Sequence, residues 1–326
     1  MARELMLLRH GKSDWSEQLD DFDRPLKERG RRGAQRMGQW LLQQELLPDR
    51  VISSPAERAI ATARHTVNAM GRDAGGIVQD RRVYAARVED LLQVLADVPD
   101  DARRVLLVGH NPGLEELMEY LEGRHIPLPS DGKLLPTATL AVIELPDDWQ
   151  ALKTGHGQLT GITRASSLPK KFPYPDAKGK ELRDRPAYYY SQSSVIPYRI
   201  RDGQPEILAV MSHKHKHWVL PKGISEPGAS LQDTAAREAL EEAGIEGEVA
   251  EQSLGSYTYK KWGAACTVEV FAMEVTRMID ETSWEESHRG REWMTPKQAV
   301  KRVHQSALKP MILALAKQLE TEAEAP

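Results

Sequence analysis

The stretch REALEEAGIEG, residues 237–247, decides how the second half of the chain folds. It completes a pattern that is typical of a helix. Ser230 is a favourable N-cap residue, Asp233 stands at the third helical position as in a variant of the capping box, and Gly244 is a favourable helix terminator. The sequence therefore predicts a helix from Leu231 to Ala243.

Three acidic side chains share one face of this predicted helix. Glu238, Glu241 and Glu242 are spaced i, i+3 and i+4, so their carboxylates project together. Two interpretations are open. The glutamates form a solvated face whose charge is offset by Arg237, or they form a site for Mg²⁺ or Mn²⁺, which prefer carboxylate oxygens and also bind phosphate oxygens.

The residues around the glutamates resemble the Nudix box. That box reads G, five residues, E, seven residues, R-E, an aliphatic residue, any residue, E-E, any residue, G and an aliphatic residue. The chain matches the box at Gly223, Arg237, Glu238, Glu241, Glu242, Gly244 and Ile245. It departs from the box at the first glutamate, where it has Ala229, and its aliphatic residue, Leu240, stands one place after the aliphatic position.

The resemblance implies an α+β Nudix fold, with a mixed sheet sandwiched by helices. It also implies that a divalent metal, Mg²⁺ or Mn²⁺, assists hydrolysis of a P–O–P linkage. By the resemblance, Glu238, Glu241 and Glu242 are metal ligands. Glu238 is also a candidate general base, and the Gly223 carbonyl is a further candidate ligand. Arg237 is expected to orient the carboxylates rather than to touch the substrate.

A second acidic segment follows the box at some distance. The stretch WEESHRGREWMTPKQAVKRV, residues 284–303, resembles the C-terminal half of Nudix enzymes that act on diphosphoinositol polyphosphates and diadenosine polyphosphates. That resemblance makes Glu285 and Glu286 candidates for an additional ligand or base. The alternative is that both are charges on a surface loop.

Basic residues precede the box. The tract HKHKHW, residues 213–218, alternates histidine with lysine, and a strand would place its histidines on one face and Lys214 and Lys216 on the other. The tract resembles a metal-binding sequence, but a basic rim that binds a polyphosphate is the preferred functional interpretation, with Lys222 as a further substrate-binding candidate. A solvated edge strand protected by lysine is the alternative.

The first half of the chain has a different pattern. Apolar runs at residues 5–8 and 104–108 each lead to a histidine beside a glycine, and both are typical of buried parallel strands. Helical patterns lie between them, at residues 28–45, 54–70 and 88–98. The alternation predicts an α/β domain with a mainly parallel sheet flanked by helices.

Two histidines are expected to meet at one edge of that sheet. His10 and His110 follow the two apolar runs, and open parallel sheets bind ligands at the carboxyl ends of their strands. The stretch SSPAERAIATA, residues 53–63, supplies Arg58 nearby. Two ordinary loop histidines are the alternative, but their equivalent positions favour a site.

These motifs resemble the histidine phosphatase superfamily, and most closely its short SixA-like branch, over about residues 1 to 150. The motifs are LRHGKSDW, DFDRPLKERG, SSPAERAIATA and VGHNPGLEELMEYL. The resemblance implies that His10 is the phosphoryl-accepting nucleophile. It implies that Arg9, Arg58 and His110 hold the phosphoryl oxygens, a task for which arginine has suitable geometry. Ser13 is a candidate for an added hydroxyl contact.

The larger branches of that superfamily also have a glutamate that protonates the leaving group. In the comparable region this chain has only Glu89 and Asp90. Imidazole leaves as a neutral group more readily than an alkoxide does, so this difference favours phosphohistidine or another activated phosphate as substrate.

The organisation expected is a phosphatase domain at residues 1–160, a linker rich in proline and charge at 161–186, and a Nudix domain at 187–326. The formal net charge of −4 does not favour nucleic acid as a partner. The single cysteine, Cys266, is typical of a reducing compartment, and no apolar run is long enough for a membrane span. We therefore expect a cytoplasmic protein with no membrane partner.

Together these features predict a two-domain phosphohydrolase. The expected Nudix substrate is a nucleoside polyphosphate, a dinucleoside polyphosphate or an inositol pyrophosphate, and a phosphohistidine protein is a possible substrate of the other domain. Two alternatives remain open. One domain serves as a non-catalytic ligand sensor, or the enzyme removes oxidised nucleotides, as the MutT branch does.

Overall fold

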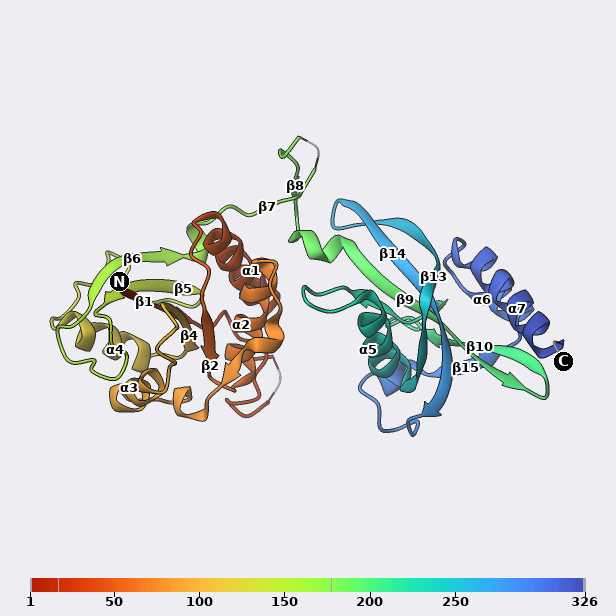
Figure 1. Ribbon diagram of the computed structural model, residues 1–326, viewed down its shortest axis with the longest axis horizontal. Coiled ribbons are helices and arrows are strands. Elements are labelled where there is room, and N and C mark those ends of the chain that lie inside the picture. Colours follow the sequence, from red (N-terminus) through yellow and green to blue (C-terminus); the bar gives the residue numbers. More distant parts are fainter. Residues whose placement is uncertain (1, 17, 177, 325–326) are drawn as a thin grey trace. The chain divides into compact units, whose positions relative to one another are not determined.

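The computed structural model describes residues 2–16, 18–176 and 178–324. It divides into two compact units, Met1–Phe172 and Pro173–Pro326. Each unit has its own sheets and its own apolar cores, so each is described by itself (Figure 1).

The first unit is built on a six-stranded sheet with the order β3-β2-β4-β1-β5-β6. Its first four strands in that order are parallel, and β5 and β6 continue the sheet antiparallel. The strands are β1 (Arg3–Arg9), β2 (Arg50–Ser53), β3 (Val78–Gln79), β4 (Arg104–Gly109), β5 (Thr139–Leu145) and β6 (Gln158–Arg164). The helices are α1 (Glu28–Gln43), α2 (Glu57–Ala69), α3 (Val88–Ala96) and α4 (Gly113–Glu122).

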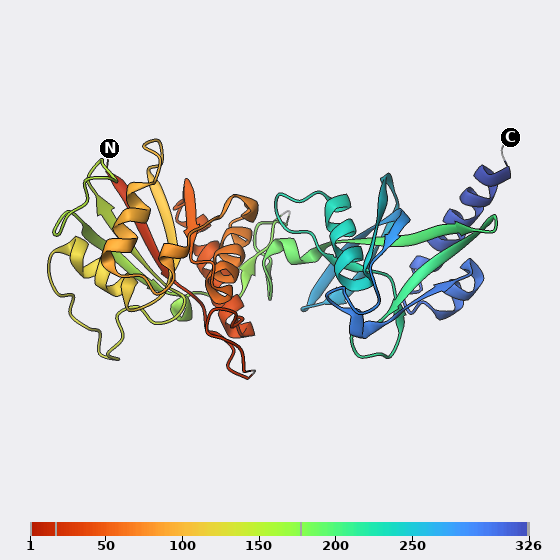
Figure 2. The same ribbon diagram turned by 90° about the horizontal axis from the view of Figure 1, so that it is seen from below.

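Helices cover both faces of this sheet. Successive residues of its central strands point to opposite faces, and because those residues are apolar, both faces are buried. Leu5 and Leu7 of β1 pack in one core with residues of α3 and α4, whereas Met6 and Leu8 pack in another with residues of α1 and α2. Figure 2 shows these two helical layers on opposite sides of the sheet. The near-continuous apolar runs in the sequence are therefore explained by burial on both faces.

The second unit contains a seven-stranded mixed sheet in which β11, β10, β9, β14 and β13 follow one another, β12 pairs with β9, and β15 pairs with β10. Among the strand pairs of the described residues, β9–β14 alone is parallel. The strands are β9 (Ser191–Arg201), β10 (Gln204–Met211), β11 (Trp218–Val219), β12 (Lys222–Ile224), β13 (Ile245–Lys261), β14 (Ala264–Met278) and β15 (Arg291–Met294). The helices are α5 (Leu231–Ala243), α6 (Pro296–Arg302) and α7 (Leu308–Glu324).

Helices lie on both faces of this second sheet as well (Figure 1). Ala235, Ala239 and Ala243 of α5 pack with apolar residues of β9, β10 and β14. Residues of α6 and α7, among them Ala299 and Ile312, form the other core with the opposite face. The small alanines bring α5 close to the sheet, which positions its glutamates beside β12.

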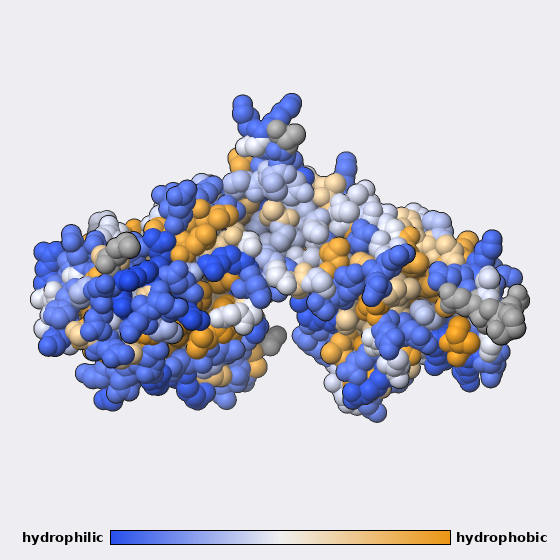
Figure 3. Space-filling view, viewed as in Figure 1, coloured by the Kyte–Doolittle hydropathy of each residue, from blue (hydrophilic) through white to orange (hydrophobic). Residues whose placement is uncertain are grey.

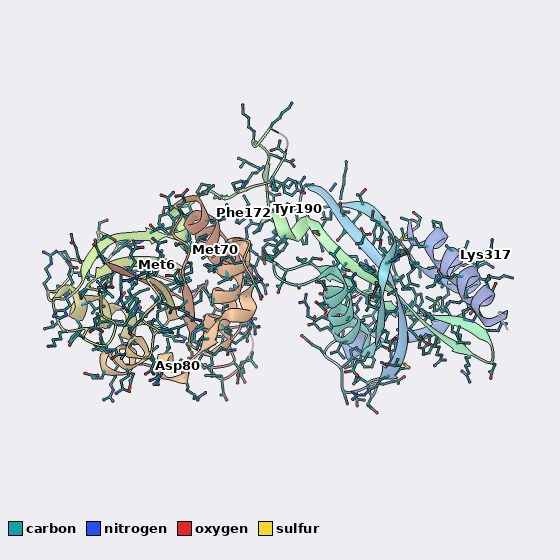
Figure 4. All side chains as sticks on the ribbon, in the orientation of Figure 1. Met6, Met70, Asp80, Phe172, Tyr190 and Lys317 are labelled. Carbon is teal, nitrogen blue, oxygen red and sulfur yellow. The ribbon has the colours of Figure 1, made fainter. Side chains whose placement is uncertain are left out.

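The predicted linker at residues 161–186 needs correction at its start. Residues 161–164 belong to β6, which is paired with β5 at the edge of the first sheet. From Phe172 onward the chain forms a short two-stranded sheet from β7 (Phe172–Pro173) and β8 (Leu182–Arg183). The guanidinium of Arg183 lies 3.1 Å from the ring centre of Tyr174 and 4.5 Å from that of Tyr190. Phe172 and Tyr190 mark this segment in Figure 4.

The expectation that the histidine–lysine tract forms an alternating strand is wrong. Residues 213–217 form a turn between β10 and β11, and His215 has a positive φ of 52°. The Ser212 hydroxyl accepts hydrogen bonds from the backbone N–H groups of Lys216 (3.1 Å) and His217 (3.2 Å). This local side-chain bonding closes a turn and competes with strand pairing.

The predicted fold classes are confirmed for both halves: a parallel-rich sheet flanked by helices, and a mixed sheet between helices. Hydrophilic residues cover much of the visible face, with hydrophobic residues interspersed (Figure 3). In the described part of the chain, no helix combines the length and the apolar character that crossing a membrane requires.

Candidate active sites

Two histidines meet at the carboxyl edge of the first sheet. Strands β1 and β4 are parallel neighbours, and their last paired residues are Arg9 and Gly109. The backbone N–H of His10 donates to the Gly109 carbonyl at 3.1 Å, which holds the two strand ends together. As a result the rings of His10 and His110 lie with their centres 5.0 Å apart.

The hydrogen bonds of His10 define which ring nitrogen can react. Nδ1 lies 2.8 Å from the carbonyl oxygen of Gly11, and because a carbonyl can only accept, Nδ1 carries the proton. Nε2 therefore carries the lone pair of the neutral ring. Nε of Arg58, in the first turn of α2, donates to that Nε2 at 3.3 Å.

Both histidines are uncharged at neutral pH. Burial, reinforced by the charges of Arg58 and Arg9, lowers the pKa of His10 from 6.5 to about 4. Burial, followed by His10 and Arg58, lowers the pKa of His110 to about 3. A neutral imidazole is the form that acts as a nucleophile.

Cationic and polar groups surround the two rings. Nη1 of Arg9 donates to the Leu135 carbonyl at 2.7 Å, while its Nε is buried without a partner among the described residues. Nε2 of His110 lies 2.8 Å from the Ser54 hydroxyl, and its buried Nδ1 has no partner there either. A cleft of about 340 Å³ opens beside them and is lined in part by Arg58 and His110.

The glutamate cluster lies in the second unit, where α5 faces β12. Ser230 caps α5, since its side chain accepts a hydrogen bond from the Asp233 N–H at 2.9 Å, and Gly244 ends it in the left-handed conformation. The Glu238 carboxylate lies against Gly223, and a Cβ atom at position 223 would overlap it. The absence of a side chain at Gly223 thus makes room for the carboxylate.

Each of the three carboxylates has a basic partner. Arg237 lies 3.6 Å from Glu238 and 3.8 Å from Glu241. Glu242 pairs at 2.8 Å with the buried Arg289 and accepts a 3.1 Å hydrogen bond from the Lys222 backbone N–H.

The three carboxylates are held in an environment that disfavours their charge. Burial, together with the charges of Glu242 and Glu241, raises the pKa of Glu238 to about 7. Burial also raises the pKa of Glu241 and of Glu242, despite the nearby arginines. Within the described residues no three His, Cys, Asp or Glu side chains stand arranged to hold a metal ion. Carboxylate oxygens are nevertheless the type of ligand that a hard divalent cation prefers.

Comparison with known proteins relates each half of the chain to a family. The model of the histidine phosphatase superfamily (branch 1) matches residues 5–83, and the model of the NUDIX domain matches residues 191–315. Nudix hydrolase 12, mitochondrial, of Arabidopsis thaliana is 30% identical over 143 residues, covering 36% of this chain and 70% of that protein.

The chain joins a histidine phosphatase domain to a Nudix hydrolase domain.

Two further proteins are similar to the phosphatase half. An uncharacterized protein of Mycobacterium tuberculosis is 30% identical over 160 residues, covering 48% of this chain and 98% of that protein. The structure of a putative phosphohistidine phosphatase SixA from Nakamurella multipartitia is 29% identical, with a TM-score of 0.43, and covers 50% of this chain and 96% of the other.

The two family matches make the chain a two-domain phosphohydrolase.

The phosphatase domain contains acidic and phenolic groups that the sequence did not indicate. The Asp21 carboxylate pairs with Arg58 at 2.7 Å, and the Tyr84 hydroxyl donates to it at 3.0 Å. The two acids suggested by sequence lie elsewhere: Asp90 accepts the Arg87 N–H at the start of α3, and Glu89 is exposed on that helix.

Ser13 is buried and lies in an isolated bridge with Leu26. Within the described residues, the Ser13 hydroxyl forms no hydrogen bond with His10 or Arg58. Its substrate contact therefore stays a prediction.

The basic candidates of the Nudix domain lie in two places. Nζ of Lys222 is 3.2 Å from the Tyr259 hydroxyl and 3.4 Å from Oε1 of Gln192, and burial lowers its pKa. Lys214 and Lys216 lie exposed in the turn after β10. These two lysines form no ion pair within the described part of the chain.

Arg289 connects the end of β10 to the box, a contact that the sequence did not predict. Its Nε donates to the Met211 carbonyl at 2.7 Å, and its Nη1 pairs with Glu286 at 2.6 Å as well as with Glu242. The backbone N–H of Glu286 donates to the Glu241 carbonyl at 3.2 Å, which places the acidic segment against the end of α5. Glu285 is exposed in that segment, and its charge contributes to raising the pKa of Glu241.

The contact at Gly223 leads to a direct prediction. Gly223→Ala should displace the Glu238 carboxylate while leaving α5 and β12 in place, because the overlap falls on the end of a flexible side chain. We expect Nudix turnover to fall about 10²-fold, the order seen when a reacting group is misplaced by about 1 Å. Turnover and thermal unfolding are measured together. Unchanged turnover, or unfolding at room temperature, would contradict this role of Gly223.

A pH dependence is expected for the phosphatase domain. Since the pKa of His10 is lowered from 6.5 to about 4, the ring stays neutral as the pH falls below 6.5 and becomes protonated only near 4. The kcat/KM of phosphoryl removal should therefore be insensitive to His10 between about pH 5 and 7, because this ratio reports the free enzyme. A substrate without ionisations in that range checks the profile. A loss of activity centred near pH 6.5 would show that His10 titrates normally.

Proposed function

We propose that the N-terminal domain removes phosphoryl groups through a phosphohistidine intermediate on His10. The observation that carries this proposal is the ring geometry: Nδ1 is fixed as the protonated nitrogen by the Gly11 carbonyl, so Nε2 offers its lone pair beside Arg58. A neutral, oriented imidazole next to a guanidinium is suited to act as a nucleophile toward a phosphoryl group.

In the proposed reaction, Nε2 of His10 attacks phosphorus and forms the N–P bond. The bond to the leaving group breaks, and the leaving group departs with its electron pair and takes a proton from solvent. Water then attacks the phosphorus and loses a proton to solvent while the N–P bond breaks. Its electron pair returns to Nε2, which releases inorganic phosphate and restores neutral His10. Arg9, Arg58 and the unpartnered Nδ1 of His110 supply donors for the phosphoryl oxygens.

We propose that the Nudix domain hydrolyses a phosphoanhydride with Mg²⁺ or Mn²⁺. Glu238, Glu241 and Glu242 would hold the metal, with the Gly223 carbonyl and Glu285 as further ligands. When bound, such an ion lowers the pKa of water and offsets the charge of the phosphates.

The other residues of the Nudix site would bind substrate and move a proton. Glu238, whose carboxylate lies against Gly223, would accept a proton from the attacking water. Lys222, held between Gln192 and Tyr259, is placed to contact a phosphate, and Lys214 and Lys216 would bind the outer phosphates of a long chain.

The proposed substrates are therefore phosphorylated small molecules: a nucleoside polyphosphate, a dinucleoside polyphosphate or an inositol polyphosphate with a pyrophosphate group. A phosphohistidine protein is the proposed substrate of the phosphatase domain. The free, buried Cys266 fits a reducing compartment, and we propose that the enzyme acts in the cytoplasm.

The test uses the full chain, a panel of these three substrate classes and a phosphohistidine peptide, with MgCl₂ or with a chelator. We expect metal-dependent cleavage of at least one polyphosphate and metal-independent release of phosphate from the peptide. Binding of a panel member without any turnover would overturn the proposal in favour of a ligand sensor.

A further inference from the structure

Asp21 holds the guanidinium of Arg58 from two sides. Nη2 of Arg58 donates to Oδ2 of Asp21 at 2.7 Å, and Nη1 donates to the backbone carbonyl of the same residue. The third nitrogen, Nε, donates to Nε2 of His10 at 3.3 Å. All three nitrogens of this buried guanidinium are therefore oriented by neighbouring groups.

This arrangement leaves part of the Arg58 donor set available. A guanidinium has five N–H groups, and three are engaged here, so one remains on Nη1 and one on Nη2. Because the group is planar, fixing three N–H directions also fixes the directions of the other two. A phosphoryl group that reaches His10 thus meets donors that are already oriented.

Asp21 is in turn held by its own neighbours. The Tyr84 hydroxyl donates to Oδ2 at 3.0 Å, and Nη1 of Arg24 donates to Oδ1 at 2.6 Å. Asp21, Tyr84 and Arg58 line the same cleft, and the Tyr84 ring lies edge-on to His110 with centres 5.4 Å apart. The loop before α1 is thereby tied to Arg58 through both the carboxylate and the backbone carbonyl of Asp21.

We propose that Asp21 is a positioning residue of the phosphatase site, which orients Arg58 toward His10 and toward the incoming phosphoryl group. The proposal rests on the function proposed for this domain. It assigns Asp21 no contact with the reacting phosphorus. Because a carboxylate near a phosphoryl group also repels it, Asp21 should assist turnover at some expense of anion affinity.

Asp21→Asn separates these two effects, since it keeps the size of the side chain and removes its charge. We expect kcat to fall about 10²-fold, as for other losses of alignment in active sites. Inorganic phosphate should bind the variant at least as tightly as the wild type. Asp23→Asn is the matched control: Asp23 is exposed in the same loop, and its side chain forms no hydrogen bond or ion pair within the described residues.

The experiment measures kcat and KM with a phosphohistidine peptide, phosphate affinity by calorimetry and thermal unfolding, all on the full chain. Reduced kcat with undiminished phosphate affinity and unchanged unfolding supports the proposal. Unchanged kcat overturns it, and so does a joint loss of kcat, phosphate affinity and stability, which indicates a structural role only.

The phosphate titration also separates this proposal from the function on which it rests. If His10→Ala retains turnover, the phosphohistidine mechanism fails. Phosphate binding to Asp21→Asn still tests Asp21 in that case, because binding needs no turnover. Weaker phosphate binding by the variant would then overturn the role of Asp21.

Discussion

Replacement of His10 by alanine is expected to abolish phosphoryl removal, with a loss on the order of 10³-fold or more, because the nucleophile that splits the reaction into two steps is gone. Arg9, Arg58 and His110 remain in the variant and can still bind an anion. The expected result is therefore a variant that binds phosphate but does not release it from a phosphohistidine peptide.

The chemical signature of the intermediate makes this prediction sharper. Wild-type protein mixed briefly with labelled substrate should carry an acid-labile, base-stable phosphoryl group, and His10→Ala should carry none. His125→Ala is the control, since His125 lies exposed on the same domain with its side chain 76% accessible. Equal labelling of wild type and His10→Ala would mean that another residue accepts the phosphoryl group.

The second large effect is expected for Glu238→Gln. This substitution keeps the shape of a side chain that fits against Gly223 but removes both its charge and its ability to accept a proton. A general base contributes roughly 10²- to 10⁴-fold to the rate of a reaction, so the rate of polyphosphate hydrolysis should fall by about 10²-fold or more. Stability should be unchanged or slightly increased, because burial and neighbouring carboxylates disfavour the charged form.

Hydrolysis is measured at saturating Mg²⁺, so that weaker metal binding by the variant is not mistaken for a loss of proton transfer. Glu248→Gln, an exposed glutamate on β13 outside the box, is the matched control. Retention of more than about a tenth of wild-type turnover by Glu238→Gln would rule out the general-base role, which requires the larger effect.

The sequence predicted most of what depends on local pattern. Glu238, Glu241 and Glu242 project from one helical face because the helix period brings them together, and capping at Ser230 and Gly244 made that helix recognisable. His10 and His110 meet because parallel neighbours end at the same edge of a sheet.

Other parts of the sites depend on contacts between distant segments. Asp21 reaches Arg58 only through the path of the loop before α1, and Arg289 reaches Glu242 from a segment that is 47 positions away in sequence, so neither contact has a periodic signal. The motif DFDRPLKERG did include Asp21, but nothing in it shows which aspartate pairs with Arg58.

Alternation of residue types misled the prediction for residues 213–217. A period of two is the signature of a strand, yet Ser212 binds the N–H groups of the tract and closes a turn instead. The domain boundary was missed for a related reason: β6 at Gln158–Arg164 is an edge strand with little apolar content, so it resembles the polar segment that follows it.

The central claim is that one chain carries two separate phosphohydrolase sites, one at His10 and one at Glu238. The most direct measurement is product analysis for wild type, His10→Ala and Glu238→Gln, each with a phosphohistidine peptide and with a polyphosphate substrate. We predict that His10→Ala loses only phosphate release from the peptide and that Glu238→Gln loses only metal-dependent cleavage of the polyphosphate. The account would be contradicted if one variant lost both reactions. It would also be contradicted if both variants retained both reactions.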